Sequence, residues 1–409
     1  MTDQTSTGAD LEELRARFRP LFERIAQGAA ERDASRELPR ELIRELADAG
    51  FGAVRVPRSH GGAGASLPQL IELLTDLAAA DSNLPQALRG HFALVEDRLV
   101  AHAHADQSVW FERFVAGQLG GNAWTEIGAV EVGDVGTKVR ESDGVLTVSG
   151  TKYYSTGSIF ADWLDVFAQR ESDGVRVIAL VPADQPGVAL LDDWDGFGQR
   201  TTGSGTTVLT DARVEASDVI DFSERFRYQT AFYQLVLLAT LAGIAENAAA
   251  EFAAQAQRRT RVYSHGAGDV WNQDPLIHQV IGKATAQGFA ARAVAVRAAQ
   301  AAQDAYLAAF ADDEAAERDA NIRAELDSAQ GQIVITAIAQ EATSHVFDAL
   351  GASAAGGGKQ LDRFWRNART VSSHNPVVFK ERIVGDWAIN GTEPPYVWAI
   401  GAQRATTAG

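Results

Sequence analysis

Apolar side chains recur at two different spacings along the chain, and the change between them divides it into three parts. Over residues 1–119 the interval is three or four residues, the spacing of one face of an α-helix. The clearest run is Leu11, Leu14, Phe18, Leu21 and Ile25. Residues 1–119 are therefore predicted to form an N-terminal helical domain.

Residues 120–222 contain shorter apolar runs that alternate with polar positions, which is typical of β-strands. The tetrapeptide ESDG occurs at 141–144 and again at 171–174, each time between two such runs. Asp-Gly in this setting is a strong signal for a β-hairpin. We therefore predict an antiparallel β domain over residues 120–222.

The helical spacing returns after residue 222 in long, alanine-rich stretches. We expect helices at about 224–260, 274–311, 315–350 and 361–373. Small alanine side chains let helices approach closely, so residues 223–409 are predicted to form a C-terminal helix bundle. The fold class of the whole chain is then α+β.

Composition narrows the classes of function. The formal net charge is −17, so the chain lacks the excess of Lys and Arg that binding to a nucleic-acid backbone requires. It contains no cysteine, and its eight histidines do not have the spacing of a metal site. The N-terminus does not resemble a targeting signal, and no apolar run reaches the roughly 18 residues of a membrane span. We therefore expect a cytoplasmic protein without a metal, a membrane or a nucleic-acid partner.

Four motifs in this order resemble those of the acyl-CoA dehydrogenase superfamily. They are VPRSHGGAGAS (56–66), AWTEIGAVEVGDVGTKV (123–139), GTKYYSTG (150–157) and LDRFWRNART (361–370). The resemblance covers nearly the whole chain. It implies an N-terminal helical domain, a middle antiparallel, barrel-like β domain that binds a flavin, and a C-terminal helix bundle.

The chain departs from that family where many members carry their catalytic base. Counting forward from the last motif, the Tyr-Glu pair of those dehydrogenases falls on His374 and Asn375. An amide cannot accept a proton, so the base is missing there. The segment 361–380 is similar instead to flavin-dependent monooxygenases that oxidise dibenzothiophene or sulfones.

This second resemblance implies a two-component oxygenase. A separate flavin reductase supplies reduced FMN, O₂ adds to form a C4a-(hydro)peroxyflavin, and a small organic substrate takes one oxygen atom. An organosulfur substrate is expected, while amines, phenols and polyketides stay open, as does FAD in place of FMN.

The resemblance also implies four catalytic residues. His374 and His91 match the late and early active-site histidines, and an imidazole can hold or release a proton near neutral pH. Asn122 matches an asparagine that can donate its NH₂ group to bound oxygen, and Thr156 falls where a hydroxyl lies beside the reactive edge of the flavin. From the residues alone, either histidine also fits a core position, Asn122 a turn, and Thr156 an ordinary strand position.

The resemblance also implies a set of residues that bind the flavin. Trp124, Thr125 and Thr156 hold positions that line the flavin ring. Arg261 resembles an arginine that reaches the cofactor of a neighbouring subunit, and Arg369 is a second candidate for the phosphate, because a guanidinium binds phosphate oxygens in pairs. Both arginines also fit exposed helix positions. The implied assembly is a homotetramer.

The substrate pocket is expected among aromatic side chains that fit a helix core equally well. They are Phe92, Trp124, Phe226, Tyr228, Phe232 and Tyr233. Two other functions stay open. One is an acyl-CoA dehydrogenase that holds FAD and uses a carboxylate relocated to Glu246 or Glu251. The other is a non-enzymatic flavin carrier.

Overall fold

The N-terminal part is helical, as its periodicity predicts. A computed structural model describes residues 9–127 and 135–397. The helices of this part are α1 (Leu11–Ser35), α2 (Arg40–Asp48), α3 (Leu67–Ala80), α4 (Asn83–Ala87), α5 (Arg89–Ala101) and α6 (Ser108–Val115). The side chain of Asp10 caps α1, and Ser66 forms a capping box with Gln69 at the start of α3. These local bonds set where the two helices begin.

The middle part is a sheet of eight strands with the order β6-β7-β3-β2-β4-β5-β8, in which β1 lies beside β4. Their bounds are β1 (Gly120–Ala123), β2 (Lys138–Ser142), β3 (Val145–Lys152), β4 (Trp163–Arg170), β5 (Arg176–Pro182), β6 (Val188–Leu190), β7 (Thr207–Val214) and β8 (Val219–Asp221). Both ESDG segments connect antiparallel neighbours, β2–β3 and β4–β5, so both predicted hairpins are confirmed. In the first, Asp143 and Gly144 have φ of 53° and 78°, the left-handed conformation of such turns.

One detail of the sheet differs from the prediction. β4 pairs in parallel with β1 and with β2, so the sheet is mixed rather than purely antiparallel. Both pairings join strands that are far apart in the chain. A local pattern of apolar residues contains no information on such partners.

The C-terminal part consists of long helices. They are α7 (Gln229–Arg258), α8 (Pro275–Ala308), α9 (Glu314–His345), α10 (Asp362–Ser372) and α11 (Val377–Asn390), the last of which was not predicted. Buried alanines line the inner face of α8, among them Ala291, Ala295, Ala298 and Ala302. Helix α7 is apolar and long enough to cross a membrane, but 78% of its most apolar window is buried inside the fold.

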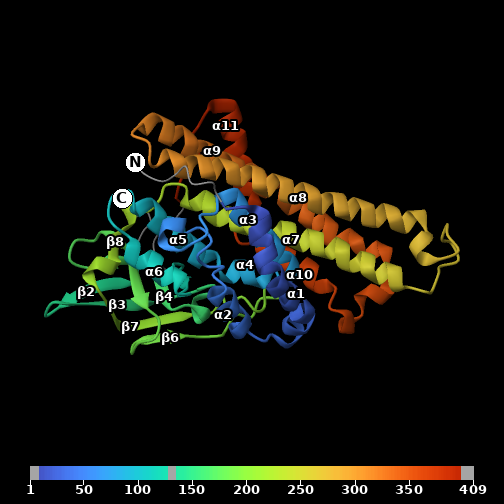
Figure 1. The fold of residues 1–409 in the computed structure, drawn as a ribbon, viewed down its shortest axis with the longest axis horizontal. Helices are drawn as coiled ribbons and strands as arrows, with labels where there is room; N and C mark the ends of the chain where they lie inside the picture. The colour runs from blue at the N-terminus through green and yellow to red at the C-terminus, as the bar shows by residue number, and fades with distance from the viewer. Residues whose placement is uncertain (1–8, 128–134, 398–409) are drawn as a thin grey trace, which may run out of the picture.

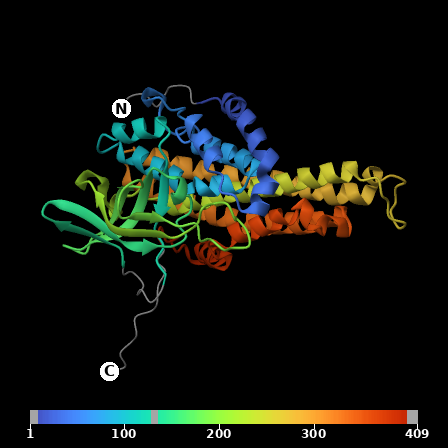
Figure 2. The ribbon, with the colours of Figure 1, turned by 90° about the horizontal axis from the view of Figure 1, so that it is seen from below.

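Figure 1 shows the sheet at one end of the molecule and α7, α8 and α9 running from it to the other end. In Figure 2 the N-terminal helices lie along one side of these long helices. One core joins the N-terminal helices to α7, α8 and α9, and the sheet has a separate core. A third cluster joins the two, because it contains Leu94 and Phe111 of the helices together with Ile178 and Leu180 of β5. The three parts are thus packed into one body.

Candidate active site

A cavity of about 910 Å³ lies where the three parts meet. Its walls come from β1 and the segment that follows it, from residues 196–204, from the first turns of α5 and α7, and from the turn after α10. A volume of several hundred Å³ is the size at which proteins bind cofactors and small substrates. The cavity is therefore the candidate site, and five residues expected to bind or react there line it: Asn122, Trp124, Thr125, Thr156 and His374.

His374 lies in the turn that follows α10, before Pro376 starts α11. Its Nε2 accepts a hydrogen bond from the Arg89 guanidinium at 3.0 Å, because an arginine can only donate. Enclosure by the cavity wall and the Arg89 charge lower the pKa of His374 to about 3. The ring stays accessible from the cavity. Both effects favour the neutral imidazole, and the catalytic role of His374 stays a prediction.

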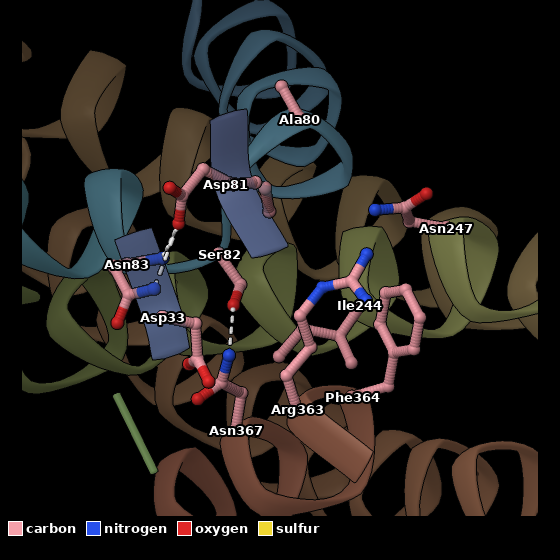
Figure 3. Close-up of a pocket in the computed structure, with 12 residues that line it drawn as sticks. Asp33, Ala80, Asp81, Ser82, Asn83, Ile244, Asn247, Arg363, Phe364 and Asn367 are labelled. Carbon is pink, nitrogen blue, oxygen red and sulfur yellow. Dashed lines mark hydrogen bonds between the residues drawn. The ribbon is translucent and has the colours of Figure 1, made fainter. Parts of the chain in front are cut away.

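Helix α10 is held by a buried polar junction, which fixes the turn that carries His374. The Gln199 backbone N–H donates to Asn367 Oδ1 at 2.6 Å, and Asn367 Nδ2 donates to Ser82 Oγ at 3.2 Å. Figure 3 shows the hydrogen bond between Asn367 and Ser82. Both residues line a small cavity of about 20 Å³. Beside it, Arg366 donates to Asp33 at 2.6 Å. The junction ties α10 to the α3–α4 connection, to α1 and to the 196–204 segment.

Asn122 and Thr156 present polar atoms from the sheet side of the cavity. Asn122 lies in β1 rather than in a turn, and its buried Oδ1 has no hydrogen-bond partner among the described residues. Thr156 lies in a turn after β3 rather than within the strand, and its hydroxyl is 2.7 Å from that of Ser204. The Asn122 oxygen is enclosed beside Gly90 of α5, so it is not an acceptor that opens into the cavity.

Trp124 and Thr125 continue the same wall. The Trp124 indole donates to Asp165 Oδ1 at 2.8 Å and stacks on Phe167, with 5.7 Å between ring centroids. Thr125 bridges to Tyr153, whose N–H donates to the Thr125 carbonyl at 2.8 Å. Both residues line the cavity, as expected for a surface on which a flat ring lies. The centre of their motif, residues 128–134, is outside the described part of the chain.

Three expected site residues do not line the cavity. His91 is fully buried; its Nε2 donates to the Gly52 carbonyl at 2.9 Å and its Nδ1 accepts from the Gly120 N–H at 3.1 Å. Both ring nitrogens are used, so the prediction of a catalytic His91 is corrected to a structural role that joins α5 to β1. Arg369 is exposed, and so is Arg261, which lies in the connection between α7 and α8 at the far end of the bundle (Figure 1).

Several aromatic candidates also belong to the core. Of the predicted pocket residues, only Trp124 and Tyr233 line the cavity. The others are fully or almost fully buried in the helical core: Phe92, Phe226, Tyr228 and Phe232. Their helical spacing was the signal of a core, which is the interpretation that the sequence had left open.

A cluster around Arg89 was missed by the sequence analysis. Arg89 opens α5, and the first turn of α7 places Gln229 and Tyr233 on the same cavity. The guanidinium lies 5.1 Å from the Tyr233 ring centroid. The only signal in the sequence was a charged residue inside the apolar stretch ALRGHFALV, where a solvated arginine is not expected.

Carboxylates are scarce in this cavity. Among the described lining residues the one acid is Glu126, which accepts from Lys152 Nζ at 2.7 Å. Burial alone would raise the pKa of Glu126, but the hydrogen bond and charge of Lys152 lower it to about 2. Glu246 is bound to Arg292 and Glu251 to Gln255, and neither lines the cavity. A base relocated to Glu246 or Glu251 is therefore contradicted.

Comparison with known proteins agrees with this geometry. A probable FMNH₂-dependent monooxygenase, SfnC of Pseudomonas putida, is 27% identical over 92% of this chain and 94% of its own length. The structure of TdsC from Paenibacillus sp. A11-2, a dibenzothiophene monooxygenase solved with FMN and indole, superposes with a TM-score of 0.84 at 27% identity, covering 94% of this chain and 98% of that one. Methanesulfinate monooxygenase MsuC from Pseudomonas fluorescens gives a TM-score of 0.84 at 26% identity, covering 96% and 99%.

Two family models match the helical parts of the chain. Residues 8–118 match the acyl-CoA dehydrogenase N-terminal domain, and residues 235–379 match the acyl-CoA dehydrogenase C-terminal domain. Together they span more than half of the chain, in the order that the four motifs predict. The chain belongs to the acyl-CoA dehydrogenase family, in its flavin-dependent monooxygenase branch.

Proposed function

We propose that this protein is the oxygenase component of a two-component flavin-dependent monooxygenase. It receives reduced FMN from a separate reductase and transfers one oxygen atom of O₂ to a small organosulfur substrate. The observation that carries the proposal is a large cavity whose wall has a neutral imidazole and an amide, His374 and Asn375, where dehydrogenases of this family carry a base. The full-length similarity to FMN-dependent monooxygenases supports it.

The lining residues suit a flavin. Trp124 and Thr125 offer a flat wall and backbone groups, and the hydroxyls of Thr156 and Ser204 offer uncharged hydrogen bonds. Asn122 lines the same wall, and its side-chain NH₂ group is the donor that it would offer to a ligand. Bound reduced FMN supplies two of the electrons that O₂ requires, and FAD with the same ring system is the alternative.

The chain contributes position, neutral hydrogen bonds and exclusion of water. Arg89 fixes the Nε2 of His374 as an acceptor and so holds the ring in one orientation beside the cavity. The Thr156 hydroxyl, paired with Ser204, would offer a bound flavin a hydrogen bond without adding charge. Phe167 and Phe222 pack against Trp124 and line the cavity with it, an apolar wall that would limit the access of water to a bound flavin. A carboxylate in this wall would repel oxygen as it gains negative charge.

The assembly belongs to the same proposal. Exposed apolar side chains lie on α8 and α11: Phe289, Val378, Phe379 and Ile389. A homotetramer would bury such a surface, and it is the arrangement in which Arg261 can reach the cofactor of a neighbouring subunit. We further propose that the enzyme works in the cytoplasm and that residues 1–119, 120–222 and 223–409 act as its three domains.

The proposal is tested with the full chain, free reduced FMN and ¹⁸O₂. We expect one ¹⁸O atom in the product of an organosulfur panel, detected by mass spectrometry, and no dependence on an acyl-CoA. If the protein instead holds FAD tightly and is reduced by an acyl-CoA without O₂, it is a dehydrogenase. Consumption of O₂ at the rate of free flavin alone would indicate a carrier.

A further inference from the structure

Arg89 is a buried cation without a counter-charge. Arg89 is only 5% exposed. No carboxylate in the described part of the chain lies within ion-pairing distance of its guanidinium. Burial lowers the pKa of Arg89 to about 10, although the nearby Tyr233 opposes this, so the guanidinium stays charged at neutral pH. Two other buried arginines have a counter-charge: Arg55 binds Glu96 at 2.8 Å, and Arg225 binds Asp165 at 2.8 Å.

The unpaired polar atoms of this cluster belong to two residues that line the cavity, Arg89 and Tyr233. One guanidinium N–H₂ is used by His374, while Arg89 Nε has no partner among the described residues. The hydroxyl of Tyr233 is also buried without a partner, and burial raises its pKa, so it stays protonated. Two unpaired donors, one of them charged, therefore lie together beside His374.

Leaving a charged donor buried and unpaired is costly, so a ligand is expected to complete it. An oxyanion is the ligand that accepts from a guanidinium and a phenol at once, and charge-assisted hydrogen bonds of this type are short and strong. A neutral aromatic sulfide offers no such acceptor. The charge of Arg89 thus distinguishes two kinds of organosulfur substrate.

We propose that Arg89 and Tyr233 form an oxyanion subsite and that the substrate is a small organic sulfinate, in which an apolar group lies against the aromatic wall. This rests on the proposed monooxygenase function and specifies its substrate. In the reaction, one oxygen atom of O₂ forms a new S–O bond and the other leaves as water. The sulfur gives up two electrons, and reduced FMN provides the other two together with two protons, so that a sulfinate becomes a sulfonate.

Binding is tested apart from turnover, with the oxidised FMN-loaded enzyme and benzenesulfonate as the probe. We expect calorimetric binding by the native chain, a roughly ten- to hundredfold weaker affinity in Arg89→Met, and partial retention in Arg89→Lys, which keeps the charge. Tyr233→Phe should lose a few-fold, about one hydrogen bond. Arg213→Met, an exposed arginine on β7, is the matched control and should bind as the native chain does.

Turnover then compares benzenesulfinate with the neutral thioanisole, using reduced FMN and O₂. Arg89→Met should raise KM for the sulfinate by roughly the same factor and leave KM for thioanisole within about twofold. Because Arg89 also binds His374, kcat is expected to fall for both substrates, so the KM values carry the test. An equal rise in KM for both substrates, or an unchanged KM for the sulfinate, would overturn the subsite. So would a loss of FMN affinity in both Arg89 variants, which would assign the charge to the flavin. If benzenesulfonate binding depends on Arg89 but no substrate is oxygenated, the subsite stands and the monooxygenase function is wrong.

Discussion

Truncating Asn367 should loosen the turn that carries His374. Asn367→Ala removes the acceptor of the Gln199 N–H at 2.6 Å and a donor to Ser82 at 3.2 Å. The Gln199 amide is then buried without a partner, which costs about 1–3 kcal/mol. Ser82 keeps its bond from Gln199 Nε2 at 3.2 Å, so its loss is small. A water molecule entering the enlarged cavity of Figure 3 would recover part of the cost, and about 2 kcal/mol is the expected net effect.

Hydrogen exchange followed by mass spectrometry measures this effect locally. A loss of about 2 kcal/mol corresponds to roughly thirtyfold more frequent opening of the peptides around 196–204 and α10. The control Asn390→Ala, at an exposed position on α11, should leave exchange of the 196–204 and α10 peptides unchanged. We also expect less product per reduced flavin, because His374 follows α10 directly. Exchange in Asn367→Ala within about twofold of the native chain would refute the assignment of this junction as the anchor of the turn.

Three further outcomes follow from the site. His374→Ala should leave FMN affinity within about twofold but divert reduced flavin to H₂O₂. Since the pKa of His374 is lowered to about 3, the product formed per reduced flavin by the native chain should stay level from about pH 5 to 8. An inflection near pH 6.5 that disappears in the variant would contradict this neutral role. Thr156→Val removes the hydroxyl bonded to Ser204 and should weaken FMN binding about two- to tenfold by fluorescence titration, whereas equal affinity would exclude the contact. The pKa of Glu126 is lowered from 4.5 to about 2, so the stability that its ionised form contributes is present above pH 4.5 and lost as the pH falls towards 2. The unfolding temperature of Glu126→Gln should therefore depend less on pH between these values. Parallel curves of unfolding temperature against pH for the variant and the native chain would contradict this role.

The elements that the sequence predicted are those that local patterns encode. Both hairpins follow from Asp-Gly between alternating runs, because the turn itself requires left-handed residues. The long helices follow from the recurrence of apolar and alanine positions. The parallel pairing of β4 with β1 and β2 depends on chain segments that are distant in sequence, and no local spacing reports it.

The sequence also could not predict which face of α5 meets the cavity. His91 was the expected catalytic residue on α5, yet Arg89 faces the cavity and His91 faces the core. Residues two positions apart on an α-helix are separated by about 200° around its axis. Choosing His91 instead of Arg89 therefore placed the wrong face of the helix on the cavity. The spacing of α5 could not settle the rotation, because nearly every residue of this helix is buried.

The amide at Asn375 and the charge at Arg89 are best understood together. The Asn375 side chain donates to Gln234 Oε1 at 2.9 Å, and both Asn375 and Arg89 line the same cavity. A carboxylate at position 375 would attract the guanidinium with an energy on the order of 2 kcal/mol even at about 8 Å and an effective dielectric constant of about 20. It would neutralise Arg89 as Glu96 neutralises Arg55 in their ion pair. Replacing the base by an amide therefore does more than remove proton abstraction, because it leaves the positive charge of the cavity for the substrate.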